Sequence, residues 1–355
     1  MRRILFVDDE PRILDGLRRM LRGQRHAWEM VFAPGGDAGV AEAERAPFDV
    51  VVTDMRMPGV DGVGLLARVQ QMHPQTLRIV LSGQTDPVVA ARAARVAHQF
   101  LFKPCSPDAV RGVVERTCEL AAGVPEELRV IVGRIDAFPV AEPALRELRA
   151  ALARSGVSHE SLSEIVERDV GMSAKVLQVI NSSFFGISPQ VTEVAAAVRM
   201  LGPGTMRELV LGAEVFRPIR ATGERAPATA PLRDHSIHVA RATADAVDGS
   251  ARGTGYATGI LHDVGKWILW DALPDRYAAI EAEARARGIP LSAMEAEVLG
   301  TTHARLGAYL LGIWNLPPVI VDAVAAHNEA LTDDRPPTNL EAALRLAHAG
   351  RAEAA

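Results

Sequence analysis

Three acidic residues stand in a row directly after an apolar segment near the N-terminus. Asp8, Asp9 and Glu10 follow the run ILFV at positions 4–7. Acidic residues are favoured where a helix begins, and Pro11 suits a first helical turn, so the triplet could simply start a helix. A hard divalent cation offers a second explanation, because it converts the repulsion between neighbouring carboxylates into shared attraction. The other polar residues of the chain decide between the two.

Other polar residues follow apolar segments in the same way. Asp54 follows the run FDVVVT, Ser82 follows LRIVL and Lys103 follows QFLF. If these runs are neighbouring strands of a parallel sheet, their carboxyl ends share one edge, where open α/β folds bind ligands. Each residue alone could be a solvated strand end, but their joint occurrence favours a site. Carboxylates, a hydroxyl and an ammonium would then converge at that edge.

The elements that must position these residues alternate along the first third of the chain. We predict strands near 4–7, 29–32, 48–53, 77–81 and 99–102, and helices near 12–22, 37–45, 61–72, 87–96 and 107–121. This alternation is typical of βαβ crossovers and predicts a parallel sheet in an α/β fold. After the segment AAGVP at 121–125, apolar residues recur every three or four positions, which predicts a nearly all-helical second half. A stretch rich in Pro, Ala, Thr and Gly at 218–233 is expected to be an exposed connection.

The first third resembles the response-regulator receiver domain. The resemblance covers residues 1–122 and lies in four short words, VDDE at 7–10, TDMRMPGVDG at 53–62, LSG at 81–83 and FKP at 102–104. It implies a flavodoxin-like fold with a five-stranded parallel sheet in the order 2-1-3-4-5. It also implies that Asp54 accepts a phosphoryl group from a sensor histidine kinase or a phosphotransfer protein.

The same resemblance implies a role for the residues around Asp54. A magnesium ion would be held by Asp8, Asp9, Asp54 and the backbone carbonyl of Arg56. Lys103 and Ser82 would assist phosphoryl transfer to Asp54, and Phe100 would be the switch residue. Two of these assignments have simpler alternatives, since Ser82 could cap the following helix and Phe100 could be a core residue. The peptide bond before Pro104 is expected to be cis, as in receivers of this kind.

A second group of residues with chemical potential lies in the helical half. The segment ATGILHDVGKWIL contains His262 and Asp263 among apolar residues, where a charged pair is costly to bury unless it is satisfied. Further histidines are His235, His303, His327 and His348. Imidazoles and a carboxylate that converge from several helices could bind a transition metal. Alternatively, His262, Asp263 and Lys266 could form a hydrogen-bonded core network without metal.

The helical half resembles the HD superfamily and, more specifically, the HDOD family of HD-related output domains. The words that carry this resemblance are RIDAFPVAEPALRELRAAL, LSEIVERDVGMSAKVLQVINSSFFG and VAAAVRMLGPGTMRELVL, and it covers residues 128–348. It implies an all-α, HD-like fold. The metal residues of the superfamily would correspond to His235, His262, Asp263, His303 and His327. Asn328 stands where phosphodiesterase relatives carry a second histidine, and no acid stands near His348, so we expect one metal at most.

Composition bounds the remaining possibilities. With 355 residues and 48% hydrophobic residues the chain can form two domains, which we place at 1–122 and 128–348. The net charge of −5 gives no general attraction to nucleic acid, and residues 1–122 and the remainder both lack a basic reading module. Two cysteines, Cys105 and Cys118, and the absence of an apolar signal or membrane-length run lead us to expect a cytoplasmic protein without membrane contact. Only three lysines occur, which suggests that each of them fills a site that needs a compact ammonium.

These features together predict a phosphorylation-dependent response regulator of a two-component system. Its receiver would bind magnesium and control an HDOD output that acts by protein contacts, either within the chain or through a receiver-mediated homodimer. A metal-dependent HD phosphohydrolase, such as a cyclic-dinucleotide phosphodiesterase under receiver control, is the rival hypothesis. Direct nucleic-acid binding is a third and is disfavoured by the acidic second half.

Overall fold

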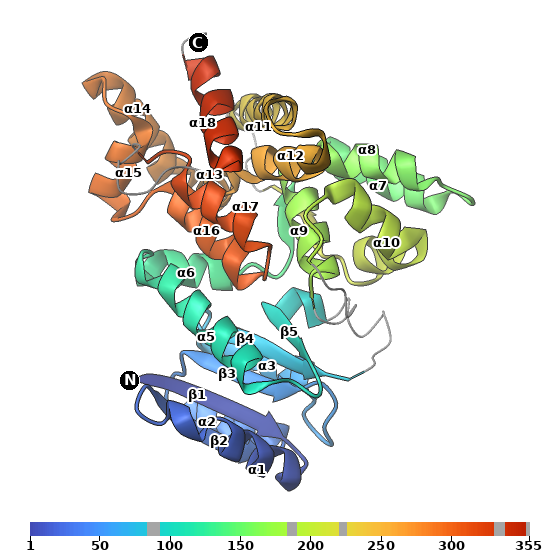
Figure 1. The fold of residues 1–355 in the computed structure, drawn as a ribbon, viewed down its shortest axis with the longest axis vertical. Helices are drawn as coiled ribbons and strands as arrows, with labels where there is room; N and C mark the ends of the chain where they lie inside the picture. Colours follow the sequence, from blue (N-terminus) through green and yellow to red (C-terminus); the bar gives the residue numbers. More distant parts are fainter. Residues whose placement is uncertain (84–92, 183–189, 220–225, 330–337, 353–355) are drawn as a thin grey trace.

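An α/β part and a helical part follow one another along the chain. The computed structural model describes residues 1–83, 93–182, 190–219, 226–329 and 338–352. The α/β part extends to residue 122 and the helical part follows it (Figure 1). Among the described residues, no helix is both long enough and apolar enough to cross a membrane.

The α/β part is built on a five-stranded parallel sheet. Its strands are β1 (Arg2–Asp8), β2 (Trp28–Pro34), β3 (Val50–Asp54), β4 (Leu77–Ser82) and β5 (Gln99–Phe102). Their order is β2-β1-β3-β4-β5, and every neighbouring pair is parallel. The predicted strands and their order are confirmed. Because all five strands point the same way, the residues that follow them lie along one edge of the sheet.

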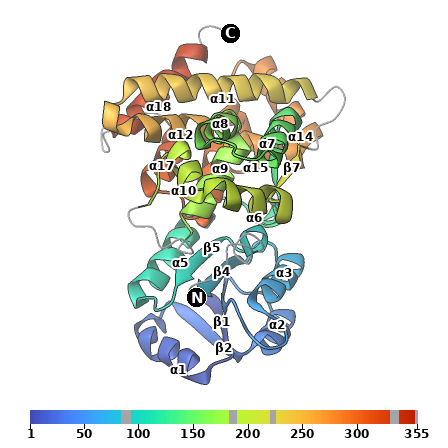
Figure 2. The ribbon, with the colours of Figure 1, turned by 90° about the vertical axis from the view of Figure 1, so that its right-hand side faces the viewer.

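Helices cover both faces of this sheet (Figure 2). They are α1 (Pro11–Met20), α2 (Gly36–Arg45), α3 (Gly62–Met72) and α5 (Pro107–Ala122), with a 3-10 turn, η1 (Arg22–Gln24), after α1. Alternate residues of β1 pack into different cores, since Phe6 contributes to the core under α1 and α5 and Val7 to the core under α2 and α3. Of the helix predicted at 87–96, residues 93–96 are helical and the rest lies outside the described residues.

The second part of the chain is almost entirely helical. Its helices are α6 (Glu126–Gly133), α7 (Glu142–Ala153), α8 (His159–Glu167), α9 (Val170–Ile180), α10 (Val194–Arg207), α11 (Ala226–Ala246), α12 (Arg252–Leu261), α13 (Val264–Ala272), α14 (Pro274–Arg287), α15 (Leu291–Leu299), α16 (His303–Ile313), α17 (Pro318–Ala326) and α18 (Asn339–Ala352), with the short turns η3 (Glu208–Gly212) and η5 (Gly249–Ala251). Two short strands in this part, β6 (Phe138–Val140) and β7 (Phe216–Pro218), pair with each other in parallel. We did not predict these two strands. Helix α11 begins at Ala226, so the connection predicted for 218–233 is in part helical.

Capping residues explain where two of these helices begin or end. Asp169 caps α9 by accepting a hydrogen bond from the backbone N–H of Met172 at 3.0 Å, which separates α8 from α9. Gly288, with φ +62°, ends α14 in the left-handed conformation that favours glycine. The apolar periodicity continues across both breaks, so it predicts the helical half without its individual helix boundaries.

The helical part packs against the β5 edge of the sheet and against α5 (Figure 1). Hydrogen bonds from buried side chains cross this interface. Lys175 Nζ on α9 donates to the carbonyl of Ala94 at 2.7 Å, and Gln99 Nε2 on β5 donates to the carbonyl of Gly312 at 3.2 Å. An ion pair joins Arg116 on α5 to Asp322 on α17 at 2.9 Å. The two parts therefore share a buried interface beside strand β5.

Three buried basic side chains, Arg78, His98 and Lys175, lie at this interface. Arg78 on β4 is 1% exposed and donates to the carbonyl of Gly133 on α6 at 2.8 Å. Its guanidinium also contacts the buried ring of His98, with Nη2 and Nε2 2.8 Å apart. Lys175 is buried and lies 4.8 Å from the centre of the Trp314 ring. Burial lowers the pKa of Arg78 to about 9 and the pKa of Lys175 to about 7.

Candidate phosphoacceptor site and histidine cluster

The polar residues predicted at the carboxyl ends of β1, β3 and β5 come together. The Lys103 ammonium, which follows β5, lies 2.7 Å from Asp8 Oδ2 and also forms an ion pair with Asp54 Oδ1. Asp8 is buried and Asp54 is partly buried. Burial alone would lower the pKa of Lys103. The hydrogen bonds and charges of Asp54 and Asp8 outweigh burial, and the pKa of Lys103 is raised above its ordinary value.

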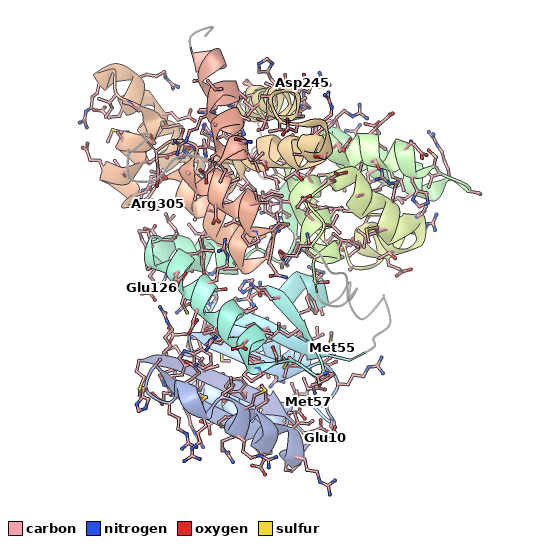
Figure 3. The ribbon with its side chains drawn as sticks, in the orientation of Figure 1. Glu10, Met55, Met57, Glu126, Asp245 and Arg305 are labelled. Atoms are coloured by element: carbon pink, nitrogen blue, oxygen red, sulfur yellow. The ribbon has the colours of Figure 1, made fainter. Side chains whose placement is uncertain are left out.

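The loop after β3 holds Asp54 at the sheet edge. Asp54 Oδ2 accepts a hydrogen bond from the backbone N–H of Arg56 at 2.8 Å. Met55 and Met57 are buried in the core below α2 and α3, whereas Arg56 between them is exposed. Figure 3 shows Met55 and Met57 at the same end of the α/β part as Glu10, which follows β1. The two methionines therefore anchor the loop and leave the Asp54 carboxylate accessible beside them.

Close packing of α3 also fixes this loop. A Cβ atom on Gly62, the first residue of α3, would lie 2.1 Å from the carbonyl oxygen of Asp54. Only glycine allows this approach. The Lys103–Pro104 peptide is cis, as the receiver resemblance implies. Gly62 thus fixes the backbone close to the Asp54 carboxylate.

The other residues predicted for this site differ in what the structure says of them. Asp9 is exposed directly after β1, and the described residues show no hydrogen bond or ion pair from its carboxylate. Phe100 is 4% exposed and belongs to the core under α2 and α3, so its predicted switch role is combined with a core position. Ser82 ends β4, but its side chain lies outside the described residues. The roles of all three stay predictions.

The residues at the sheet edge have the chemistry that a magnesium ion requires. Asp8, Asp9 and Asp54 supply hard carboxylate oxygens, and the backbone carbonyl of Arg56 is the fourth predicted donor. The existing geometry shows that two of the carboxylates already share one cation, the Lys103 ammonium. A bound Mg²⁺ would supply additional positive charge for an incoming phosphoryl group. The identity of the metal and its ligands remain predictions.

Five histidines and one aspartate converge in the helical part and are called the histidine cluster here. They are His235 on α11, His262 and Asp263 at the junction of α12 and α13, His303 on α16, His327 after α17 and His348 on α18. Four of the six, namely His262, Asp263, His303 and His327, are buried. The ring of His348 lies 5.1–5.2 Å, between ring centres, from the rings of His235, His262 and His327.

One half of the histidine cluster brings three ring nitrogens close together. His235 Nε2 is 3.2 Å from His262 Nε2 and 3.3 Å from His348 Nδ1. Asp263 Oδ2 lies 3.3 Å from His262 Nε2 and 3.6 Å from His235 Nε2. Lys266 Nζ contacts the same carboxylate oxygen at 2.9 Å. The predicted contact between His262, Asp263 and Lys266 therefore exists, but it is one side of a larger group.

The other half of the histidine cluster is organised by hydrogen bonds. His303 Nδ1 lies 2.7 Å from a carboxylate oxygen of Glu295, which also accepts from the hydroxyl of Tyr277. His303 Nε2 lies 2.7 Å from the side-chain nitrogen of Asn328. Both ring nitrogens of His303 are therefore engaged. Asn328 thus takes up the ring nitrogen of His303 that a metal would otherwise need on this side.

The residues of the histidine cluster differ in the direction of their pKa shifts. Burial alone would raise the pKa of Asp263, but His262 and Lys266 outweigh it and hold that pKa well below its ordinary value. Burial lowers the pKa of His327 to about 4 and, together with His262, lowers that of His348 to about 2. Burial and Lys266 also lower the pKa of His303, but the carboxylates of Glu295 and Asp263 reverse the shift and raise it.

Sequence reasoning missed two structural details of this cluster. It noticed His348 but did not include it among the candidate ligands, because an aspartate is expected at that place. It did not identify Glu295 as the partner of His303. The signal for Glu295 was its position on the apolar segment LSAMEAEVLG, where a buried acid needs a partner.

Family models match both parts of the chain. The model of the HDOD domain matches residues 138–330, more than half of the chain. The chain belongs to the HDOD family. Residues 4–115 match the model of the response regulator receiver domain, so the α/β part is a receiver domain and the helical part carries an HDOD domain. The boundaries that we placed at 122 and 128 stay predictions.

Curated relatives are similar to parts of this chain. An uncharacterized protein of Treponema pallidum is 24% identical over 226 residues, which are 61% of this chain and 43% of that protein. The hydrogenase transcriptional regulatory protein HoxA of Cupriavidus necator is 29% identical over 222 residues, again 61% of this chain and 43% of the relative. The transcriptional regulatory protein GlrR of Escherichia coli is 26% identical over 218 residues, 60% of this chain and 45% of the relative. The chain thus spans less than half the length of these relatives.

Solved structures are similar to parts of this chain. A virulence factor, cj0248, of Campylobacter jejuni is 17% identical and has a TM-score of 0.51, with 62% of this chain and 79% of that chain covered. The MmoQ response regulator of Methylococcus capsulatus is 23% identical and has a TM-score of 0.48, with 60% of this chain and 85% of that chain covered. At these identities the first likeness concerns the fold alone.

Proposed function

We propose that this chain is a phosphorylation-dependent response regulator in which Asp54 accepts the phosphoryl group. A receiver domain joined to an HDOD domain already makes it a regulator with an output domain. In the proposed reaction, an Asp54 carboxylate oxygen forms a bond to phosphorus, and the bond from phosphorus to a kinase histidine nitrogen breaks. Mg²⁺ held by Asp8, Asp9, Asp54 and the carbonyl of Arg56 would offset the charge of the phosphoryl oxygens.

The shared contact of Lys103 with Asp8 and Asp54 is the observation that supports this proposal best. An isolated ammonium among carboxylates could be a simple ion pair. Here it joins the ends of three different strands at the sheet edge that binds ligands in open α/β folds. A phosphoryl group on Asp54 would add negative charge within reach of Lys103 and would compete with Asp8 for it. The contact is therefore able to report the phosphorylation state.

Labelling of the full chain tests the acceptor. With acetyl phosphate and Mg²⁺ we expect one phosphoryl group per chain, stable in acid and labile in base, and no label in Asp54→Asn. Asp15→Asn is the matched control, because Asp15 is an exposed acid on α1 that pairs only with the neighbouring Arg18 among the described residues. Label that persists in Asp54→Asn, or that depends equally on Asp15, contradicts the proposed acceptor.

We further propose that the output of the HDOD domain acts by protein contacts that the receiver controls. The β5 and α5 surface, which would move with the phosphorylation state, is already packed against α16 and α17 in this chain. Helix α16 carries His303 and α17 leads into His327, so the packed helices connect the receiver to the histidine cluster. A change at β5 can therefore reach the HDOD core without an intervening loop.

The rival function is a metal-dependent phosphohydrolase at the histidine cluster. Incubation of the full chain with cyclic dinucleotides and Mn²⁺ separates the two hypotheses. We expect no turnover that depends on the cluster. Turnover that is abolished by His262→Ala, with the fold retained, contradicts an output that acts by protein contacts alone.

A further inference from the structure

We propose that the histidine cluster holds a single nitrogen-ligated divalent transition metal ion, of the zinc class, and that His348 is one of its ligands. The donors would be Nε2 of His235, Nε2 of His262, Nδ1 of His348 and the carboxylate of Asp263. This inference goes beyond the proposed receiver switch and does not rest on it. It also differs from the rival hydrolase, because an imidazole replaces the terminal carboxylate and the site holds one ion.

The spacing of the donor atoms matches one coordination sphere. Four metal bonds of about 2.0–2.1 Å in a tetrahedron place the donor atoms about 3.3 Å apart. His235 Nε2 is 3.2 Å from His262 Nε2 and 3.3 Å from His348 Nδ1. Asp263 Oδ2 is 3.6 Å from His235 Nε2 and 3.3 Å from His262 Nε2. It also pairs with Lys266 Nζ at 2.9 Å. The three histidines come from separate helices, so short-range sequence geometry does not impose these distances.

Hydrogen bonds outside the cluster turn a ring lone pair towards this position. The carbonyl of Gly259 can only accept, so His262 Nδ1 donates to it, at 2.7 Å, and His262 Nε2 of the neutral ring carries a lone pair. Without a cation, His235 Nε2 would have at most one N–H to divide between the nitrogens of His262 and His348. A metal ion satisfies all three at once. Metal-binding histidines commonly have this kind of outer hydrogen bond to a carbonyl.

Buried polar atoms without partners give independent support. Asp263 Oδ1 and His327 Nε2 are both buried and meet no hydrogen-bond geometry among the described residues, although Asp263 Oδ1 lies 3.3 Å from His303 Nε2 and 3.7 Å from His327 Nε2. His327 Nδ1 donates to the carbonyl of Val324 at 2.7 Å, so the Nε2 of the neutral ring carries a lone pair. Such groups are costly in a core unless a ligand or a water molecule satisfies them. Both atoms lie at the carboxylate that would be the oxygen ligand, on the side of His303 and His327.

The contacts of His303 favour one metal ion over two. A second ion would need His303 Nε2, but Asn328 lies 2.7 Å from that nitrogen and Glu295 holds the other ring nitrogen. The remaining donor set contains three imidazoles and one carboxylate. Such ligands favour zinc, cobalt, nickel or iron(II) over magnesium, which prefers oxygen ligands. The ion would connect α11 and α18 to the junction of α12 and α13.

Cobalt binding by the full metal-free chain tests this proposal. We expect one equivalent of Co²⁺, the intense visible absorption of tetrahedral cobalt, and displacement by Zn²⁺. His348→Ala should lose at least about tenfold in Co²⁺ affinity and lose the tetrahedral spectrum. His238→Ala is the control, since His238 is an exposed histidine on α11. His348→Asp should keep one ion with an altered spectrum and should bind Mn²⁺ relatively better than the unchanged chain does.

A second measurement keeps the result independent of folding and of the receiver. Amide hydrogen exchange in α18 should become slower when Co²⁺ is added to the unchanged chain, and this protection should be lost in His348→Ala. Thermal unfolding in the absence of metal and labelling of Asp54 should be the same in all variants. No Co²⁺ binding by the unchanged chain, two equivalents, or an unaltered spectrum in His348→Ala overturns the proposal. None of these outcomes alters the expected label on Asp54.

Discussion

Each of the three lysines lies at a place where a compact ammonium contacts buried or partly buried oxygen atoms. Lys103 joins Asp8 and Asp54, Lys175 donates to the carbonyl of Ala94, and Lys266 pairs with Asp263. Guanidinium groups occupy most other basic positions of the chain. The scarcity of lysine was therefore an informative signal at the residue scale, because an ammonium can approach several oxygen atoms from one point and a planar fork cannot.

Exchange of Lys103 for arginine tests this difference. We expect Lys103→Arg to slow labelling of Asp54 by acetyl phosphate about tenfold, which corresponds to about 1.4 kcal/mol, because the larger group cannot contact both carboxylates from the same position. The control is Lys266→Arg, which lies in the HDOD domain and should label at the rate of the unchanged chain. Equal rates for Lys103→Arg and the unchanged chain would refute the argument from ammonium geometry.

Sequence alone predicted the meeting of Asp8, Asp54 and Lys103 better than it predicted the histidine cluster. Asp8, Asp54 and Lys103 each follow an apolar strand, and parallel strands bring such residues to one edge, so their meeting follows from local pattern and topology. The histidine cluster depends on how six helices pack, namely α11, α12, α13, α16, α17 and α18. His348 enters it through the packing of α18 against α11, which periodicity does not encode, and the expectation of an aspartate directed attention away from it.

At the scale of elements, strands were predicted well because their apolar runs are short and bounded by polar or turn residues. The short strands β6 and β7 were missed, since three residues that pair across a distance of almost eighty positions give no periodicity signal. The contact between α6 and the β4 entry was missed for a similar reason. It depends on close backbone approach, which only a glycine at the contact allows.

The contact of α6 with the receiver predicts the effect of a small substitution. A Cβ atom on Gly133 would lie 1.8 Å from the backbone carbonyl oxygen of Pro74. Gly133→Ala should therefore destabilise the chain by about 1–3 kcal/mol, because helix and turn must move apart. Gly112→Ala on α5 is the control, since a Cβ atom there meets nothing within 4 Å, and alanine should be neutral or stabilise by up to about 1 kcal/mol. Urea midpoints measure both, and similar midpoints would contradict this account of α6.

At the scale of the whole molecule, the buried Lys175 links the two parts of the chain to pH. Burial lowers its pKa to about 7, with Asp136 acting in the opposite direction. Between about pH 7 and pH 10 the unfolded chain keeps the Lys175 proton and the folded chain has lost it. The contribution of Lys175 to the free energy of unfolding therefore rises with pH in this window, by up to about 1.4 kcal/mol per pH unit. Below about pH 7 this contribution is constant.

Lys175→Met removes this contribution and keeps an apolar side chain of similar length. We expect the difference in unfolding free energy between variant and unchanged chain to favour the variant most near pH 6 and to shrink as pH rises to 10. Urea unfolding at several pH values measures this difference. A difference that does not change with pH would show that Lys175 keeps its charge at the interface, where the Trp314 ring lies beside it.

The central claim is that phosphorylation of Asp54 acts on the HDOD domain through the interface of β5 and α5 with α16 and α17. Amide hydrogen exchange of the full chain, with and without acetyl phosphate and Mg²⁺, tests this claim most directly. The account predicts a change in exchange at β5 and along residues 303–326 in the unchanged chain and no change in Asp54→Asn. A chain that is fully labelled on Asp54 but shows unaltered exchange along 303–326 would contradict it.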